Sequence, residues 1–509
     1  MNEEPKATRE GSGPRVCVVR TGAANLASVV AALRRAGAQP LVSSEPAELL
    51  RAEYAVLPGV GAFGPAMMRL AESGLDRALH ARVRSGLPTL GICLGMQLFC
   101  EESEESPGIP GLRIVRGAVR RFGGSLPLPQ LGWNRIESPG GDGGLLAPGW
   151  AYFANSYRLS EEPPGFRAWT AVYGERFVAA LEGSEPHTSG LLLCQFHPEL
   201  SGPWGLALIR RWLGMRAAPE AAPRAAEVSS HAVQTSSRDL AAASGALRVI
   251  PCLDIRDGRV VKGRHFEGLV DSGDPLELAL RYEAEGADEL ALLDITATVE
   301  GRASALAVLR AIRAAIGIPI VMGGGIRSEA DAAAAVEAGA DRVSVNSAAV
   351  ADPSLVERLA ARFGVQCVVV AIDAARVTVQ DPRGGLDSKP AWRVYVEAGR
   401  RATGLDPVTW AADCARRGAG EILLTSIDRD GTGRGYDLEL LGAVAAASGL
   451  PVIASGGAAG GAEGLRHFDE AAAAGARGLL AAGAFHRGEL RIGDIKRHLE
   501  ERKRGVRTC

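Results

Sequence analysis

Residues 318–328 read IPIVMGGGIRS, and residues 450–460 read LPVIASGGAAG. Each stretch is a short apolar run that ends in glycines, which is typical of a buried parallel strand followed by a tight turn. Their surroundings also match, because AGADRVSVNSA follows the first at 338–348 and AGARGLLAAGA follows the second at 474–484. CLDIRDG resembles AIDAARV, and LLDIT resembles TSIDRD. The pattern indicates that four β/α units occur twice, although any barrel contains similar strand-loop-helix sequences, which is the alternative explanation.

The C-terminal half contains eight such apolar runs, with Ala-rich stretches of helical composition between them. They lie at 248–254, 288–294, 318–325, 341–346, 366–373, 421–428, 450–457 and 477–483. Eight strands that are each followed by a helix predict a (β/α)8 TIM barrel, here with a twofold half-barrel repeat. The fold class is therefore α/β.

The segment at 216–245 differs from the rest of the chain in composition. It is rich in Ala, Pro and Ser and poor in large apolar residues. That composition is typical of a linker. We predict a disordered tail at 1–14, an N-terminal domain at 15–215, a linker at 216–245 and the barrel at 246–509.

The overall composition narrows the class of protein. The net charge is −2, which does not favour a nucleic-acid partner or an anionic membrane surface. The polar start and the lack of a long apolar run predict neither a signal peptide nor a membrane span. The eight cysteines include no C-x-x-C pair. We expect a reduced, cytoplasmic protein without a metal or another cofactor.

Asp254 and Asp373 end the first and fifth predicted strands, at equivalent positions of the repeat. Active sites of such barrels lie at the carboxyl ends of the strands, so both side chains should face one mouth. Two carboxyl groups with different pKa values can serve as general acid and general base. The alternative is that each Asp only caps the next turn.

Glycines and small polar residues follow four of the strands. Backbone N–H groups in such turns can close around a phosphate. The repeat then predicts a phosphate site at each side of the mouth, and hence an elongated substrate with a phosphate at each end. Tight turns without a ligand are the alternative explanation. The residues are Gly323, Gly324, Gly325, Asn346 and Ser347 in the first half, and Ser455, Gly456, Gly457, Ala482 and Gly483 in the second.

Four charged residues open strands at the opposite face of the barrel: Arg248, Glu289, Arg342 and Glu421. Two positive and two negative charges would form a neutral ring there. From the residues alone, we interpret this ring as a salt-bridge network that stabilises the barrel.

Cys93 lies in GICLG, the thiol counterpart of the G-x-S-x-G nucleophile elbow, in which a strand turns sharply into a helix. About a hundred residues later, His197 can transfer the proton and Glu199 can orient the imidazole. Backbone N–H groups of Gly59, Val60 and Gly61 are candidates for an oxyanion hole. The three parts together predict a thioester intermediate and amide hydrolysis, whereas a lone Cys would be a buried apolar residue.

GICLGMQLF with QFHPE resembles the class I (triad) glutamine amidotransferases. PGVGAFG, LGWN and YFANSY are similar to the glutaminase of imidazole glycerol phosphate synthase. The C-terminal half resembles its cyclase in CLDIRDGRVVKG, DSGDP, LDITAT, GGGIRS, AIDAARV, TGLD, GAGEILLTSIDRDGT, ASGGA and FH. The resemblance covers the whole chain except the predicted tail and linker.

The resemblance implies that glutamine is hydrolysed and that its ammonia converts phosphoribulosyl-formimino-AICAR ribonucleotide to imidazole glycerol phosphate and AICAR ribonucleotide, in histidine biosynthesis. It implies that Asp254 and Asp373 are the catalytic pair, that Lys262 lies on a mobile loop, and that Gln97 contacts glutamine. Substrate or phosphate contacts are implied for Gly324, Asn346, Asp430, Gly431, Ser455 and Gly457. The ring at the strand starts becomes an ammonia gate, and one chain with both domains in contact implies a monomer.

The sequence departs from the family pattern at four places. RTGAAN at 20–25 replaces the usual Asp-Tyr-Gly-x-Gly-Asn, and Asn155 replaces a His. Arg342 stands where the gate Lys is usual, and Gly483 stands where a Ser is common. Two rival functions remain: a sugar-phosphate isomerase barrel that carries a glutaminase, and a regulatory nucleotide-binding scaffold with degenerate sites.

Overall fold

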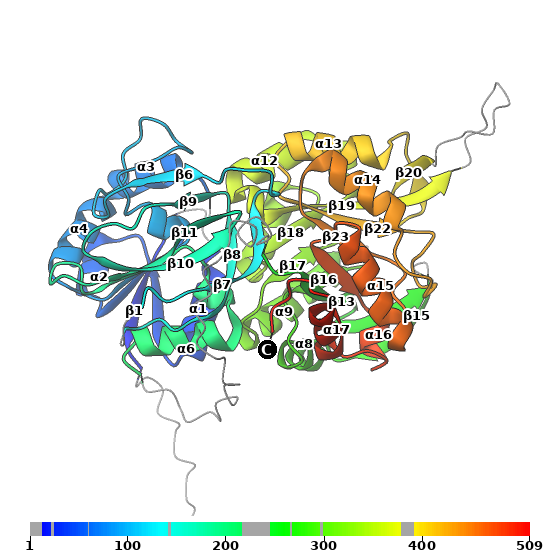
Figure 1. The fold of residues 1–509 in the computed structure, drawn as a ribbon, viewed down its shortest axis with the longest axis horizontal. Coiled ribbons are helices and arrows are strands. Elements are labelled where there is room, and N and C mark those ends of the chain that lie inside the picture. The colour runs from blue at the N-terminus through cyan, green and yellow to red at the C-terminus, as the bar shows by residue number, and fades with distance from the viewer. Residues whose placement is uncertain are drawn as a thin grey trace, which may run out of the picture.

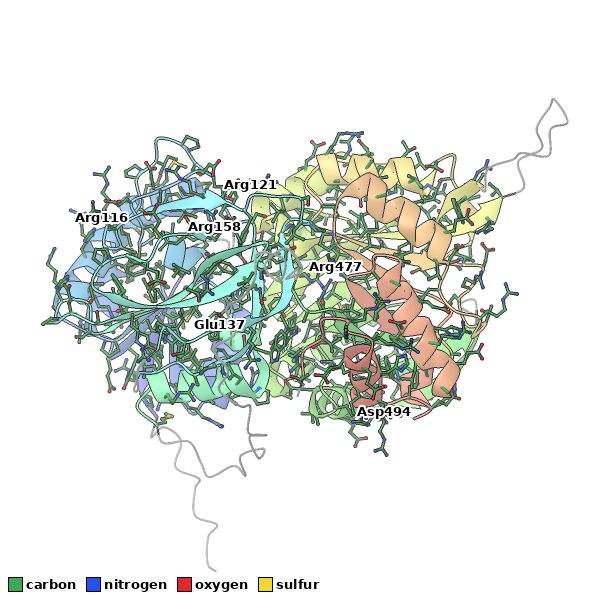
Figure 2. All side chains as sticks on the ribbon, viewed as in Figure 1. Arg116, Arg121, Glu137, Arg158, Arg477 and Asp494 are labelled. Carbon is green, nitrogen blue, oxygen red and sulfur yellow. The ribbon has the colours of Figure 1, made fainter. Side chains whose placement is uncertain are left out.

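The computed structural model describes residues 13–21, 25–59, 61–140, 144–215, 245–264, 267–295, 299–377 and 391–508. They form two domains that lie side by side (Figure 1). The predicted tail and linker lie outside the described residues, except for residues 13, 14 and 245. Charged side chains of both signs cover the two domains, with Arg116 and Arg121 on the first and Asp494 on the second (Figure 2).

A seven-stranded sheet forms the centre of the first domain. Its strands in spatial order are β10 (Phe166–Tyr173), β11 (Glu175–Gly183), β12 (Leu191–Cys194), β4 (Thr89–Ile92), β3 (Tyr54–Leu57), β1 (Arg15–Val19) and β2 (Gln39–Ser43). The pairs from β12 to β2 are parallel, and β10–β11–β12 are antiparallel. The strands β12 and β4 are buried along their whole length, so the residues that follow them emerge from a rigid support.

Helices and smaller sheets surround this central sheet. The helices are α1 (Leu26–Arg35), α2 (Pro46–Arg51), α3 (Phe63–Ser73), α4 (Leu75–Arg84), α5 (Leu94–Gln97) and α6 (Gly202–Trp212), with the short turn η1 (Pro198–Leu200). The strands β5 (Glu102–Ser103), β6 (Ala118–Arg121) and β9 (Tyr157–Leu159) form one small sheet, and β7 (Gln130–Ile136) pairs with β8 (Gly149–Asn155) in another. The β7–β8 pair lies at the boundary with the second domain (Figure 1).

The second domain is a closed barrel of parallel strands, because the first strand pairs with the last. Its staves in order are β13 (Arg248–Arg256), β16 (Leu290–Asp294), β17 (Ile320–Gly323), β18 (Arg342–Val345), β19 (Val368–Val377), β22 (Glu421–Ser426), β23 (Val452–Ser455) and β24 (Gly478–Ala481). Each of the eight predicted apolar runs overlaps one of these strands, so the predicted barrel is confirmed.

Helices cover the outside of the barrel: α8 (Pro275–Ala284), α9 (Val299–Ala315), α10 (Glu329–Ala338), α11 (Ser347–Ala351), α12 (Ser354–Phe363), α13 (Pro407–Arg416), α14 (Leu438–Ser448), α15 (Gly461–Ala473), α16 (Gly483–His486) and α17 (Ile492–Glu501). Buried apolar side chains fill the interior, among them Ile250, Val321, Val369, Leu423 and Ile453. The interior is therefore a packed core, as is usual for this fold.

The two halves of the barrel share local features that the repeat predicts. Gly324 has a φ of +84° and Gly456 has a φ of +88°, so both strand-end turns use the left-handed region. A Cβ at Gly324 would also lie 1.9 Å from the carbonyl oxygen of Asp294, so only glycine fits there. The first strand of each half carries an antiparallel extension: β14 (Arg259–Arg264) and β15 (Glu267–Gly273) beside β13, and β20 (Ala391–Val396) and β21 (Arg401–Ala402) beside β19.

Polar contacts join the first domain to the amino ends of the barrel strands. The indole Nε1 of Trp133 donates to the carbonyl of Asp288 at 2.8 Å. The carboxylate of Asp341 accepts from Asn25 at 2.9 Å and from Ser28 at 2.6 Å. Since these bonds lie at the start of the strands, the first domain sits against the end of the barrel opposite the mouth.

Candidate active sites

Cys93 occupies a strained turn between β4 and α5. Its φ is +53° and its ψ is −111°, a conformation that side-chain-bearing residues seldom adopt and that is common at functional sites. The flanking glycines allow the turn, because a Cβ at Gly91 would lie 2.7 Å from Leu193 and one at Gly95 would lie 2.0 Å from the carbonyl oxygen of Leu57. The thiol is buried within the first domain. The structure therefore has the predicted nucleophile-elbow geometry.

His197 and Glu199 follow β12, the neighbour of β4, so the sheet brings them to Cys93. His197 Nδ1 lies 2.8 Å from Glu199 Oε1, and the imidazole also interacts with the Cys93 thiol through a hydrogen bond. Burial alone would lower the pKa of His197, but the Glu199 carboxylate and a Cys93 thiolate raise it well above its ordinary value. The three groups thus form a hydrogen-bonded chain that can hold a thiolate beside an imidazolium.

The predicted oxyanion loop packs directly on the elbow. A Cβ at Gly59 would lie 2.2 Å from the backbone nitrogen of Gly95, so a larger residue does not fit. Gly61 has a φ of +103°. Val60 lies outside the described residues. Gly59 thus packs against Leu94 and Gly95, directly after Cys93, whereas the role of these glycines in binding an oxyanion stays a prediction.

Gln97 is buried one helical turn after Cys93. Its Nε2 donates to the carbonyl of Tyr157 at 3.1 Å and to Gln195 Oε1 at 3.0 Å. Gln195 Nε2 in turn lies 3.7 Å from the Cys93 sulfur. The contact between Gln97 and glutamine stays a prediction, because its amide nitrogen already bonds within the protein.

Sequence reasoning missed Gln195 and Tyr152 near the thiol site, and Glu105 beside the glycine loop. Gln195 stands two positions before His197, which is the signal that could have found it. Glu105 accepts from the backbone N–H of Phe63 at 2.8 Å, next to the glycine loop, and burial raises its pKa. Tyr152 is buried beside His197, and among the described residues its hydroxyl has no hydrogen-bond partner. Glu105 and Tyr152 carry no motif that distinguishes them from other acidic or aromatic residues.

The ring of charges at the strand starts is fully buried. Arg248 Nη1 donates to Glu289 at 2.7 Å, and Arg248 also pairs with Glu421. Arg342 bonds to both carboxylates, Glu289 and Glu421. Burial alone would lower the pKa of Arg342, but the two carboxylates hold it well above its usual range. The four predicted residues therefore close a neutral ring across the base of the barrel.

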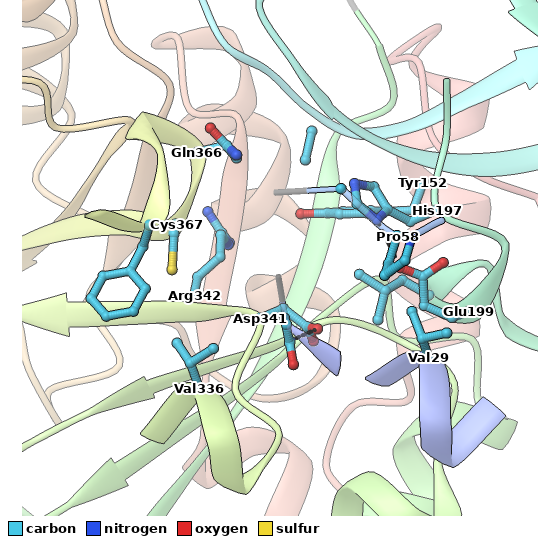
Figure 3. Close-up of a pocket in the computed structure, with 15 residues that line it drawn as sticks. Val29, Pro58, Tyr152, His197, Glu199, Val336, Asp341, Arg342, Gln366 and Cys367 are labelled. Atoms are coloured by element: carbon cyan, nitrogen blue, oxygen red, sulfur yellow. Dashed lines mark hydrogen bonds and ion pairs between the residues drawn. The ribbon is translucent and has the colours of Figure 1, made fainter. Parts of the chain in front are cut away.

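One small cavity lies at the domain boundary, with His197 of the thiol site and Arg342 of the ring in its lining. It has a volume of about 40 Å³ and is lined from the first domain by Pro58, Gly59, Tyr152, His197 and Glu199, and from the barrel by Asp341, Arg342, Gln366 and Cys367, among others. Tyr152 and His197 lie on one side of it, opposite Arg342, Gln366 and Cys367 (Figure 3). His197 and Arg342, from the two domains, therefore border the same cavity.

A larger cavity of about 840 Å³ opens at the mouth of the barrel, and both Asp254 and Asp373 line it. Asn346 Nδ2 donates to Asp373 Oδ2 at 2.8 Å. Burial raises the pKa of Asp373 to about 6, although hydrogen bonds from Asn346 and Thr425 oppose the shift. Asp254 accepts from the Cys252 thiol at 3.4 Å. The two carboxyl groups share one cavity but have different surroundings.

The predicted phosphate and substrate residues also line this cavity: Gly324, Asn346, Asp430, Gly431, Ser455 and Gly457. Those of the first half follow β17 and β18, and those of the second follow β22 and β23. The side chain of Lys262, in β14, lies outside the described residues. The cavity is thus large enough for an elongated ligand, and its binding residues stay predictions.

No group of His, Cys, Asp and Glu side chains within the described ranges is arranged to hold a metal ion. In the same part of the chain, none of the helices has the length and apolar character that a bilayer crossing requires.

Both halves of the chain match known protein families. Residues 248–491 match the family described as Histidine biosynthesis protein, and residues 21–213 match Glutamine amidotransferase class-I. The chain is 53% identical over 260 residues to imidazole glycerol phosphate synthase subunit HisF of Mycobacterium tuberculosis strain H37Ra, covering 51% of this chain and 94% of that protein. It is 53% identical over 264 residues to the HisF subunit of Pyrobaculum aerophilum, covering 52% and 98%. The chain therefore belongs to the imidazole glycerol phosphate synthase family, with a class I glutamine amidotransferase domain fused ahead of a HisF-type barrel.

Proposed function

We propose that this chain is a bifunctional synthase of histidine biosynthesis, in which ammonia made from glutamine at Cys93 is consumed at the barrel mouth. There it converts phosphoribulosyl-formimino-AICAR ribonucleotide to imidazole glycerol phosphate and AICAR ribonucleotide. One observation supports this most directly: His197 and Arg342 line the same cavity at the base of the barrel. An amidase that merely happened to be fused to a barrel would not need that arrangement.

Glutamine hydrolysis follows from the thiol site. The Cys93 thiolate attacks the amide carbon of glutamine, and His197 gives its proton to the departing nitrogen, so that ammonia leaves and a thioester remains. Water then attacks the thioester, His197 takes a proton from that water, and glutamate departs. Glu199 keeps the imidazole in the orientation that both transfers require. N–H groups of the loop at 59–61 are the proposed donors to the oxyanion.

The ammonia then crosses the barrel core. In bulk water near neutral pH it would take up a proton and lose the lone pair with which it attacks. The apolar core around Ile250, Val321 and Leu423 keeps water away from that path. The charged ring stands at its entrance, so Arg342 must shift to let a molecule pass. We propose that this shift is the gating step.

At the mouth, Asp373 and Asp254 are proposed to move protons during ring formation. A carboxyl group with a pKa of about 6 is partly protonated near neutral pH, so Asp373 suits the proton-donating role. Asp254 then suits the accepting role. No cofactor is required, because every step is an addition, an elimination or a proton transfer. Both sites lie on one chain, so a monomer in the cytoplasm would suffice.

The decisive experiment uses a Cys93→Ala variant of the full chain. Formation of imidazole glycerol phosphate from glutamine should fall to background, because the nucleophile is absent. An ammonium salt at high pH should still drive cyclisation at the wild-type rate, since the mouth is untouched. Loss of both activities would contradict the two-site proposal. Isomerisation of a sugar phosphate by wild-type protein without any nitrogen donor, and no imidazole product with one, would instead support the rival isomerase.

A further inference from the structure

The two predicted phosphate sites of the barrel mouth differ in their polar side chains. One follows β17 and β18 in the first half, and the other follows β23 and β24 in the second half. In the repeat, 338–348 matches 474–484, so Gly483 is the counterpart of Ser347. In the same way, 318–328 matches 450–460, so Ala459 is the counterpart of Arg327. The first half therefore offers a hydroxyl and a guanidinium, and the corresponding positions of the second half offer neither.

A guanidinium reaches the predicted second-half site from another position. Arg487 ends the short helix α16, and its side chain lines the mouth cavity. A Cβ at Gly483 would lie 2.7 Å from Arg487 Nη1, so the guanidinium lies in the space that a side chain at position 483 would fill. The described arginines that line this cavity are Arg327, which follows the glycines after β17, Arg400, which follows β20, and Arg487, which follows β24 and contacts Gly483.

Glu489 fixes the orientation of this guanidinium. Its carboxylate accepts from Arg487 Nε at 2.6 Å and from Nη2 at 2.9 Å. The two bonds use one edge of the planar guanidinium, so Nη1 is directed toward Gly483. Gly460 makes room for the carboxylate, since a Cβ there would lie 2.4 Å from Glu489 Oε2. Glycines of two successive strand-end turns thus make room for one ion pair.

We infer that Arg487 binds one terminal phosphate of the substrate, with Glu489 as its positioning residue and Gly483 as the residue that admits it. This inference rests on the proposed function. Nη1 would donate a charge-assisted hydrogen bond to the phosphate, in the place where a hydroxyl at position 483 would otherwise act. The Arg487 guanidinium and a serine side chain at 483 would occupy the same space, so only one of them can bind the phosphate there.

The test measures cyclisation with an ammonium salt, so that the thiol site has no influence. Arg487→Met should raise the KM for the bisphosphate substrate on the order of ten- to a hundredfold, with kcat within about twofold, because a charge-assisted contact is lost. Of the two products, which each carry one phosphate, only one should inhibit more weakly. Glu489→Gln should give a smaller effect in the same direction. Arg466→Met is the matched control, because Arg466 has the same exposed side-chain fraction of 59% but does not line the cavity.

Gly483→Ser in the Arg487→Met background provides the second readout. The serine should recover much of the lost affinity, and it should lower affinity or leave it unchanged where Arg487 is present. Unchanged KM and inhibition in Arg487→Met, or equal weakening of both products, would overturn the inference. Failure of the wild-type protein to cyclise with ammonium would instead overturn the proposed function.

Discussion

His197 Nδ1 lies 2.8 Å from Glu199 Oε1, and both side chains are about 95% buried, with exposed fractions of 5%. Glu199→Gln keeps the shape but removes the charge that orients the imidazole and stabilises its protonated form. We expect glutamine hydrolysis to fall on the order of a thousandfold or more, as in other triads, while ammonium-driven cyclisation stays unchanged. A coupled glutamate assay measures the loss. Glu185→Gln is the control, since it changes an exposed Glu that pairs with His187 at 3.4 Å.

The same pair predicts a pH effect. Because the pKa of His197 is raised, its imidazole stays protonated at pH values above its ordinary titration range. The proton is lost as the pH rises through the raised pKa. Without the Glu199 carboxylate, this loss should occur at lower pH. The alkaline limb of the residual hydrolysis in Glu199→Gln should therefore move toward neutral pH. An alkaline limb at the wild-type position would contradict the assigned contact.

Asp373 predicts a stability change with a defined sign. Its pKa is about 6 in the folded state against 3.8 ordinarily, so its favourable contribution is complete below 3.8 and is lost as the pH rises through 6. Asp373→Asn should therefore stabilise the protein at pH 7.5 by about 1 to 3 kcal/mol, and change little near pH 4. Urea unfolding at both pH values measures this. Asp352→Asn should show the opposite sign, because hydrogen bonds from Ser354 and Arg358 lower the pKa of Asp352.

Arg342 predicts a combined effect on stability and coupling. Arg342→Met leaves two buried carboxylates with Arg248 alone, which should cost about 3 to 5 kcal/mol in the free energy of unfolding. Arg342→Lys keeps the charge and should cost less. Both variants should consume more glutamine per imidazole product, because the ring no longer closes as in the wild type. A ratio of one glutamine per product in Arg342→Met would contradict the gating role.

Substitutions of Trp133 test how the contact between the two domains affects glutamine hydrolysis. Its indole donates to Asp288, and Arg507 lies 4.1 Å from the ring centroid. Trp133→Phe removes the hydrogen bond but keeps an aromatic ring, so it should cost about 1 kcal/mol at the interface. Trp133→Ala should cost several times more. We expect glutamine hydrolysis measured with the bisphosphate substrate to fall in the same order, while hydrolysis without it should remain.

Much of the fold was predictable from the sequence. The strand runs end in glycines such as Gly324, because the backbone has a positive φ at the turn. The glycines therefore predict the position of each turn from the sequence. GICLG with QFHPE predicted the thiol site in the same way. The run at 366–373 was predicted to end at Asp373, but β19 continues to Val377, because antiparallel pairing with β20 extends it.

The relations between distant segments came only from the tertiary structure. Arg248 and Glu421 are 173 residues apart, and no local pattern states that they bond. The residues alone favoured a stabilising salt-bridge network there, the family resemblance implied a gate, and the tertiary structure adds that Arg342 and His197 line one cavity. Arg487 was overlooked for the same reason, since it enters the mouth from the end of α16 and carries no motif. The backbone conformation of a turn depends on neighbouring residues, so the sequence predicts it. A cavity between two domains depends on how the closed barrel and the central sheet pack together, so only the tertiary structure shows it.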